Sequence, residues 1–300
     1  MYYYSLNEYL KNTFGEKVYK ISLNGGMTCP NRDGKIDTRG CIFCSRGGSG
    51  EFSADCMLSV TKQIEQAKKR IKAKTDCKKF IAYFQPFTNT YASIAYLKKI
   101  FYEAINNDEI VALSIATRPD CLPDDVISLL DELNKIKPVW VELGLQSIHK
   151  QTAEYIRRGY SLDVYDAAVE KLRKININII THIIIGLPNE DDEMILQSVK
   201  YAGERSNGVK LQLLHVLKNT DLCDEYEADK FKTLSLEEYC EILGKCIEVL
   251  PENVVIHRLT GDGDKKILVA PMWSADKKRV LNTINKYLKD NNITQGNKTS

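Results

Sequence analysis

The sequence predicts an α/β fold in which strands and helices alternate to form a partial (β/α)6 TIM-type barrel. Two observations support this prediction. Short runs rich in Val, Ile, Leu and aromatic residues alternate with amphipathic helical stretches, and no low-complexity linker divides residues 15–260. Strands separated by helices pair in parallel through right-handed crossovers, which gives a sheet that is either open or curled into part of a barrel.

The predicted strands are too short to be helices and are rich in residues that favour β-structure. They are residues 18–24, 79–85, 110–118, 138–147, 175–188 and 209–217. The helices predicted between them are residues 58–74, 91–106, 123–136, 162–174 and 190–205. Two of these helices begin with acidic residues, Asp124 with Asp125 and Glu190 with Asp191, which the positive end of a helix dipole favours.

The alternation changes after residue 218. We expect a helix over 235–249, a strand over 253–261 and a final helix over 276–290. We interpret these elements as an α/β extension that packs on the barrel. The predicted domains are therefore a core at 14–255 and a C-terminal extension at 256–300.

Polar residues stand at or near the ends of all six predicted strands, where apolar ones would be expected. They are Asn24, Gln85, Thr117, Arg118, Gln146, Ser147, His182 and His215. In barrels of this type the chemistry takes place at the C-terminal ends of the strands. Their convergence on one face therefore predicts a functional site there.

Charge and hydropathy restrict the partners of the chain. Lys and Arg number 42 and Asp and Glu 40, so any nucleic-acid contact must be a local patch. The sequence has no secretory signal pattern and no apolar run long enough to cross a membrane. We therefore expect a cytoplasmic protein without a membrane partner, whose nine cysteines are thiols or metal ligands rather than disulfides.

Three cysteines lie together in "CPNRDGKIDTRGCIFC", namely Cys29, Cys41 and Cys44. The segment has no apolar periodicity that would bury them in a core. A structural zinc site normally needs four ligands, and no partnered second pair is found, although zinc stays an alternative. Three thiolates are the set expected for a 4Fe-4S cluster with one iron open to another ligand. The remaining cysteines are expected to be small buried hydrophobes: Cys56, Cys77, Cys121, Cys223, Cys240 and Cys246.

Several motifs carry a resemblance to a known family. "CIFC" after the first strand, "VELGLQS", "RRGYSLDVYDAAVEKLRK" and "HIIIGLPNED" resemble the radical S-adenosyl-L-methionine (SAM) superfamily, in the branch of the elongator catalytic subunit and the oxygen-independent coproporphyrinogen oxidases. "CPNRDG", "AYFQPFTNTYA", "ATRPDCLPDDV", "LLHVLKNTDL" and "IHRLTGDG" together resemble its bacterial YtqA/YhcC type. The resemblance covers roughly residues 3–290. The gap from Cys29 to Cys41 is longer than the superfamily's usual spacing, which points to a subset.

The resemblance implies a cofactor site. Cys29, Cys41 and Cys44 would hold a 4Fe-4S cluster, SAM would bind its open iron, and a donor such as flavodoxin or ferredoxin would reduce it. SAM cleavage would then give a 5'-deoxyadenosyl radical that abstracts a hydrogen from the substrate. The residues that would surround the cofactors are Phe43 at the cluster, Gln85 at the SAM amino group, Gln146 at the ribose, Arg158 or its neighbour Arg157 at the carboxylate, and His182 at the barrel mouth.

Other polar residues have no evident task at SAM and are candidates for substrate binding. They are Arg118, His215, Lys218, His257, Arg258 and Asp262. Their charges suit a carboxylate or a phosphate. The basic residues of 68–74 and of the C-terminal helix could contact phosphates, and a solvated helix face is the alternative.

The resemblance further implies a substrate. Proteins of this type are linked to the wobble uridine of bacterial tRNA, where 5-carboxymethylaminomethyluridine becomes 5-aminomethyluridine. A tRNA partner is therefore expected. The alternatives are the same radical chemistry on a small, porphyrin-like molecule, and a non-catalytic protein that binds zinc.

Overall fold

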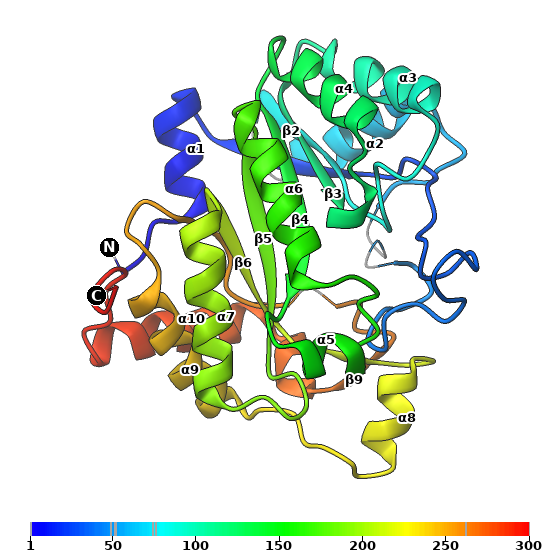
Figure 1. Cartoon of the computed structure of the whole chain (residues 1–300). Coiled ribbons are helices and arrows are strands. Elements are labelled where there is room, and N and C mark those ends of the chain that lie inside the picture. Colours follow the sequence, from blue (N-terminus) through cyan, green and yellow to red (C-terminus); the bar gives the residue numbers. More distant parts are fainter. Residues whose placement is uncertain are drawn as a thin grey trace.

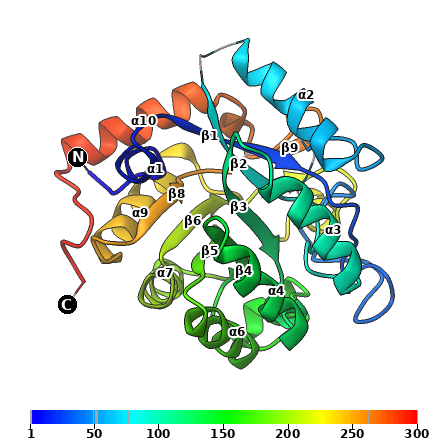
Figure 2. The ribbon, with the colours of Figure 1, turned by 90° about the horizontal axis from the view of Figure 1, so that it is seen from above.

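The computed structural model describes residues 2–48, 50, 53–73, 75, 77–261 and 263–299. Within these residues, seven parallel strands form one sheet in the order β1-β2-β3-β4-β5-β6-β8 (Figure 1). The strands are β1 (Val18–Leu23), β2 (Lys79–Phe84), β3 (Ile110–Thr117), β4 (Val139–Gln146), β5 (Asn178–Ile185), β6 (Gly208–Leu213) and β8 (Val255–Arg258). The strands follow one another in sequence order except that β7 lies outside this sheet. The sheet curls into a half-barrel, and the predicted fold class is confirmed (Figure 2).

Helices cover the convex side of the sheet, as seen from above in Figure 2. They are α2 (Val60–Lys72), α3 (Ile94–Ile105), α4 (Asp124–Asn134), α6 (Leu162–Lys174) and α7 (Asp192–Arg205). Their apolar faces carry Leu97, Leu130 and Val199 into one buried cluster with strand residues such as Val141. Several ends are capped as the sequence suggests; the Asp191 side chain, for example, accepts a hydrogen bond from the Met194 amide at 2.9 Å.

The N-terminal helix α1 (Leu6–Phe14) lies beside both edge strands, β1 and β8 (Figure 2). Its Leu10 is buried in a small cluster with Ile81, Trp140 and Ile180, which lie on separate strands of the sheet. A β-bridge between Ser5 and Ile256 ties the start of the chain to β8. The helix thereby closes the interior of the half-barrel at the end where the strands begin.

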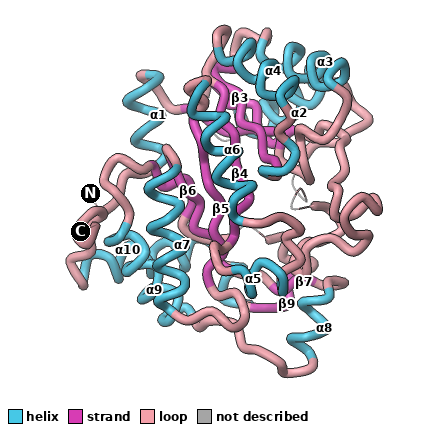
Figure 3. Tube along the Cα trace, viewed as in Figure 1, coloured by secondary structure: helices cyan, strands magenta, loops and turns pink. Residues whose placement is uncertain are grey.

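The C-terminal part differs from the prediction in two places. The expected sixth strand ends at Leu213, and its last residues form β7 (Val216–Leu217), which pairs antiparallel with β9 (Leu268–Ala270) near α5 (Lys150–Tyr155) and α8 (Asp221–Glu227) (Figure 3). The strand expected in the extension is β8, which pairs with β6 and adds a seventh strand at the edge of the barrel sheet.

This pairing continues the sheet across residue 255, and the domain limits 14–255 and 256–300 stay a prediction. The helices α9 (Leu236–Val249) and α10 (Lys277–Asp290) form where the sequence predicts them. In the described part of the chain, no helix combines the length and apolar character needed to cross a membrane.

Candidate cofactor and substrate site at the barrel mouth

A cavity of about 250 Å³ lies between the cysteine loop and the C-terminal ends of the strands. Most of the predicted site residues line it: Cys29, Cys41, Phe43, Cys44, Gln85, Arg118, Gln146, Arg158, His182, His215 and Arg258. Lys218 and His257 do not line it, and Asp262 lies outside the described residues. The structure therefore gathers polar residues from strands far apart in the sequence around one cavity.

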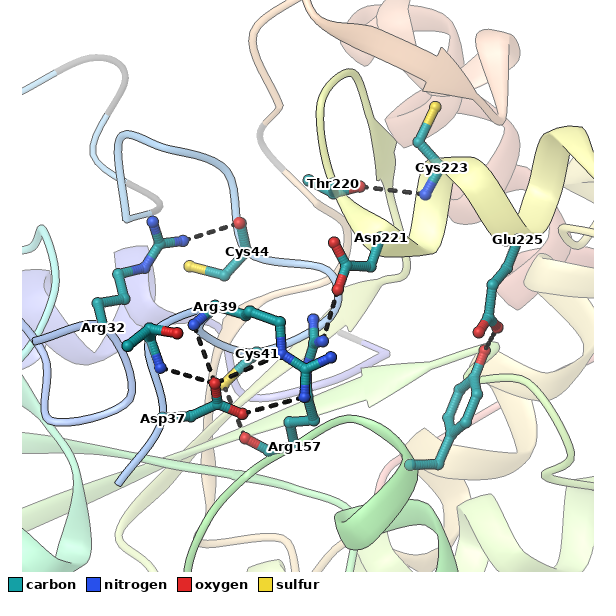
Figure 4. A network of polar contacts seen from close by, with 12 residues as sticks. Arg32, Asp37, Arg39, Cys41, Cys44, Arg157, Thr220, Asp221, Cys223 and Glu225 are labelled. Carbon is teal, nitrogen blue, oxygen red and sulfur yellow. Dashed lines mark hydrogen bonds and ion pairs between the residues drawn. The ribbon is translucent and has the colours of Figure 1, made fainter. Parts of the chain in front are cut away.

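The loop that carries the cysteines is closed by its own side chains (Figure 4). Arg32 donates to the backbone carbonyls of Cys44 at 2.8 Å and Ser45 at 2.6 Å, which ties the start of the long gap to the end of the three-cysteine segment. Asp37 accepts from the Arg39 amide at 3.0 Å, and hydrogen bonds from Arg39 and from the Thr38 amide lower its pKa to about 2. The long gap thus folds into a compact turn that fixes Cys44.

A second set of contacts holds Cys41. The Asn31 side chain donates to the carbonyl of Arg157 at 2.7 Å and lies 3.5 Å from the Cys41 sulfur. The Ile42 amide donates to the Ile156 carbonyl at 3.2 Å. The cysteine loop is therefore attached to the segment that follows α5.

The three thiols are half-buried, form no disulfide and line one cavity. Burial, reinforced by the nearby Cys44, raises the pKa of Cys41 to about 12, while Arg118 acts in the opposite direction. Among the described residues, no group of three His, Cys, Asp or Glu is placed to hold a single metal ion. A 4Fe-4S cluster makes a different demand, because each thiolate binds its own iron. Three cysteines that line one cavity fit such a cluster.

The other cysteines follow the prediction with one exception. Cys77, Cys121, Cys223, Cys240 and Cys246 are buried. Cys56 is exposed, so the prediction that it is a core residue is wrong. It lies in the turn before α2, outside the apolar face that the helix buries.

Arg158 and its neighbour Arg157 point to different places. Arg157 pairs with Asp221 of α8 at 2.5 Å (Figure 4), whereas Arg158 lines the cavity. Arg158 donates to the carbonyls of Leu145 at 2.9 Å and Ser147 at 2.6 Å, and through Nε to that of Tyr160 at 3.1 Å. In the part of the chain that the structure describes, its Nη2 makes no hydrogen bond and remains available to a ligand.

Arg118 is already neutralised by a neighbour. Its guanidinium makes a bidentate pair with Asp120, at 2.9 and 2.8 Å, and donates to the Arg158 carbonyl at 2.8 Å. Its guanidinium carbon and that of Arg158 lie 5.1 and 4.6 Å from the centre of the Tyr160 ring. Because Asp120 already neutralises its charge, the main role of Arg118 is to position Arg158.

Gln146 owes its direction to a break in the sheet. It has φ of 62°, and the register between β4 and β5 shifts between Gly144 and Gln146. A bulge of this kind redirects a side chain at the end of a strand. Gln85, at the end of β2, accepts a hydrogen bond from the Ser22 hydroxyl at 2.5 Å.

Glu142 is fully buried inside the half-barrel below these residues, at the centre of a polar network. Its Oε1 accepts from Lys20 and Ser114, both at 2.6 Å, and its Oε2 accepts from His182 at 2.7 Å and from Lys210. Burial alone would raise the pKa of Glu142, but the two ammonium groups outweigh it and hold that pKa well below its usual value.

Three residues of this network, Lys20, Glu142 and Lys210, are absent from the sequence-based candidates. The signal was present, because each is the charged residue of an otherwise apolar or uncharged strand: "VYKISL", "VWVELGLQ" and "GVKLQL". A charge inside such a strand has to meet a partner when the strand is buried. His182 is bound to Glu142, and burial and Lys210 lower its pKa to about 4, so it is neutral at pH 7.

The remaining histidines are packed against other groups. His257 lies edge-on to Trp140, with 5.6 Å between ring centres, and burial holds its pKa well below the usual value. His215 is enclosed by two glycines, since a Cβ on Gly261 or Gly263 would come within 2.5 or 2.6 Å of its ring. Lys218 is exposed on the turn after β7. His257 and Lys218 are therefore separate from the cavity.

Comparison with known proteins agrees with this geometry. Residues 37–202, more than half of the chain, match the family model of the radical SAM superfamily, and residues 206–290 match that of the radical SAM C-terminal domain. The YtqA protein of Bacillus subtilis is 43% identical over 295 residues, which are 98% of this chain and 92% of that protein.

More distant relatives match in part. The tRNA uridine(34) acetyltransferase of Methanocaldococcus jannaschii is 27% identical over 163 residues, 53% of this chain and 30% of that protein. The solved structure of Methanocaldococcus infernus Elp3 lacking residues 1–46 shares the fold, with a TM-score of 0.66, 19% identity, and coverage of 93% of this chain and 64% of that one. With its curled parallel sheet, its three-cysteine loop and these matches, the chain belongs to the radical SAM superfamily of enzymes.

Proposed function

We propose that this protein binds a 4Fe-4S cluster and SAM at the barrel mouth and acts on the wobble uridine of tRNA, converting 5-carboxymethylaminomethyluridine to 5-aminomethyluridine. The bond between the amine nitrogen and the carboxymethyl carbon would break, and the carboxymethyl unit would leave as glyoxylate with an oxygen taken from water. This oxidation would be balanced by the reductive cleavage of SAM to methionine and 5'-deoxyadenosine, which takes up the hydrogen removed from the substrate. The observation that carries the proposal is that three cysteines line the same cavity as the cationic side chains of Arg158, Lys210 and Arg258. When bound and reduced, the cluster with SAM would supply the 5'-deoxyadenosyl radical. The reductant would be a one-electron donor such as flavodoxin or ferredoxin.

The chain's own residues would hold these groups in place. Cys29, Cys41 and Cys44 would each bind one iron. Arg158 would bind the carboxylate of SAM through Nη2, because its other N–H groups are already used by backbone carbonyls. Gln85 lines the cavity at the end of β2, where its amide oxygen would accept from the SAM ammonium.

Gln146 and the loop around Phe43 would complete the cofactor site. Gln146 leaves the sheet at the bulge of β4 and would donate to the ribose hydroxyls. Phe43 lines the cavity between two of the cysteines and would keep water from the cluster. Since these residues reach the cavity from separate elements, the SAM site would depend on the half-barrel keeping its curvature.

Two observations support a tRNA substrate. The acetyltransferase that matches half of this chain is named for uridine 34 of tRNA. The interior of the cavity has Lys210 and Arg258, which suit an acidic substituent on a base inserted from outside. The experiment below separates this substrate from a small porphyrin-like molecule and from a protein that merely binds zinc.

The decisive experiment is anaerobic reconstitution with iron and sulfide, followed by SAM and dithionite. We expect visible iron–sulfur absorption and 5'-deoxyadenosine formation, both lost in Cys29→Ala, Cys41→Ala or Cys44→Ala. Cys56→Ala is the matched control, since Cys56 is exposed and outside the cavity, and it should behave as wild type.

The second step adds tRNA from a strain in which the modification is blocked. The carboxymethylaminomethyl nucleoside should decrease as the aminomethyl nucleoside forms, measured by mass spectrometry. Bound zinc without iron–sulfur absorption would contradict the enzyme assignment. 5'-Deoxyadenosine formation with unchanged tRNA would contradict the substrate.

A further inference from the structure

The cationic network below the cofactor residues has a surplus of positive charge. The ammonium groups of Lys20 and Lys210 share the carboxylate of Glu142, which is fully buried, while the Lys210 side chain is only 6% exposed. The two lysines come from β1 and β6, and Glu142 comes from β4, so three strands bring these charges together. Burying two cations against one anion is costly, and with both lysines protonated it leaves one positive charge that Glu142 does not balance.

Among the described residues, one hydrogen-bond donor of the network has no acceptor. Glu142 accepts four hydrogen bonds, two on each oxygen, and has no capacity for another. Lys210 donates to Glu142 and to the Tyr83 hydroxyl, the latter at 3.1 Å. Within the described residues its third N–H has no acceptor. Because Lys210 also lines the cavity, this donor is available to a molecule that enters from the barrel mouth.

The charges around Lys210 come from five strands. They are Lys20 on β1, Tyr83 on β2, Glu142 on β4, His182 on β5, and His257 with Arg258 on β8. Burial lowers the pKa of Lys210 to about 7, and Lys20 and Arg258 act in the same direction, while Glu142 opposes them. An anionic ligand beside Lys210 would favour its protonated form.

We propose that Lys210 is the specificity residue of the site, and that its ammonium, fixed by Glu142 and Tyr83, binds a carboxylate of the substrate at the floor of the cavity. The inference rests on the proposed function, in which that carboxylate is the one on the carboxymethylaminomethyl group. SAM also has a carboxylate, but Arg158 is placed to bind it. A backbone phosphate of tRNA cannot reach a side chain this buried, whereas the substituent of an inserted base can.

The test compares two anticodon stem-loops on the reconstituted enzyme with SAM. One carries 5-carboxymethylaminomethyluridine at the wobble position, and in the other the carboxylate is a primary amide of nearly the same size. For wild type we expect KM for the amide to be at least about tenfold higher than KM for the acid. Loss of one charge-assisted hydrogen bond usually weakens binding by about this factor. Lys210→Met should raise KM for the acid by a similar factor and bring the ratio close to one.

Two further variants and one binding measurement separate this role from a structural one. Lys210→Arg should retain a preference for the acid, because the guanidinium keeps the charge. Lys200→Met is the matched control, because Lys200 is exposed on α7. Calorimetry in buffers of different ionisation enthalpy should show that wild type takes up a fraction of a proton when the acid binds near pH 7, and that Lys210→Met takes up none.

The outcomes are distinguishable. A wild-type enzyme that prefers neither the acid nor the amide overturns the inference without any variant being needed. Unchanged discrimination in Lys210→Met also overturns it and leaves the proposed function in place. A wild-type enzyme that forms 5'-deoxyadenosine but processes neither stem-loop overturns the proposed function, and the inference with it.

Discussion

Replacing Glu142 by glutamine keeps the shape of the side chain and removes the carboxylate that Lys20 and Lys210 share. At pH 7 the fold then either keeps two buried ammonium groups without that counter-charge or loses a proton from one of them. Losing a proton about 3.5 pH units below the ordinary lysine pKa of 10.5 costs about 5 kcal/mol. Breaking a buried ion pair by removing one partner costs about 3 to 5 kcal/mol, and we expect a loss of stability in that range.

The assay is urea unfolding of Glu142→Gln and of wild type at pH 7 and at pH 9.5. The difference in the free energy of unfolding between wild type and Glu142→Gln should be smaller at pH 9.5, because removing the proton from a lysine costs less free energy at the higher pH. Glu132→Gln is the matched control: Glu132 pairs with Lys98 at 3.2 Å, both half-exposed, and such pairs contribute less than about 1 kcal/mol. A deficit in Glu142→Gln no larger than in this control, or independent of pH, would refute the reasoning.

Three more predictions follow from the same contacts. Arg158→Gln should weaken SAM binding at least about tenfold in equilibrium dialysis, whereas Arg157→Gln should change it little because Arg157 pairs outside the cavity; equal losses would contradict the assignment. Arg32→Ala frees the Cys44 carbonyl and should lower the iron content after reconstitution, and full iron content would show that the loop does not need this contact. His182 has a pKa lowered to about 4, so folding favours its neutral form, and stability should fall by about 2 to 3 kcal/mol between pH 6.5 and 4. In urea unfolding, the free energy of unfolding of His182→Gln should fall less than that of wild type between pH 6.5 and 4. An equal fall in both proteins would exclude protonation of His182 as the cause.

The strands and helices of the barrel could be predicted because their apolar residues repeat with the period of each element. The seventh strand was harder to place. Its residues Val255 and Ile256 read as a strand, but their position beside β6 is set by pairing that a single sequence does not reveal. The split of the sixth predicted strand into β6 and β7 also depends on a partner, Leu268–Ala270, far along the chain.

The candidate site, too, could be predicted from the sequence only in part. The cysteine loop could be read from its spacing and composition. Six of the eight polar residues predicted at the strand ends line the cavity, whereas Asn24 and Ser147 do not, because they bind Gln63 and Glu190 instead.

The network around Glu142 was missed, because its members are separate charges in separate strands, and only the register brings them together. His257 was expected at the cavity and instead packs on Trp140, because its side chain lies toward the closed end of the half-barrel.

The most direct test of the account follows a hydrogen atom from substrate to SAM product. An anticodon stem-loop would carry deuterium on the carbons that flank the amine nitrogen of the carboxymethylaminomethyl group, and the reconstituted enzyme would be given SAM and dithionite. The account predicts 5'-deoxyadenosine that contains one deuterium, together with the aminomethyl nucleoside. Unlabelled 5'-deoxyadenosine formed while the nucleoside stays unchanged would contradict it.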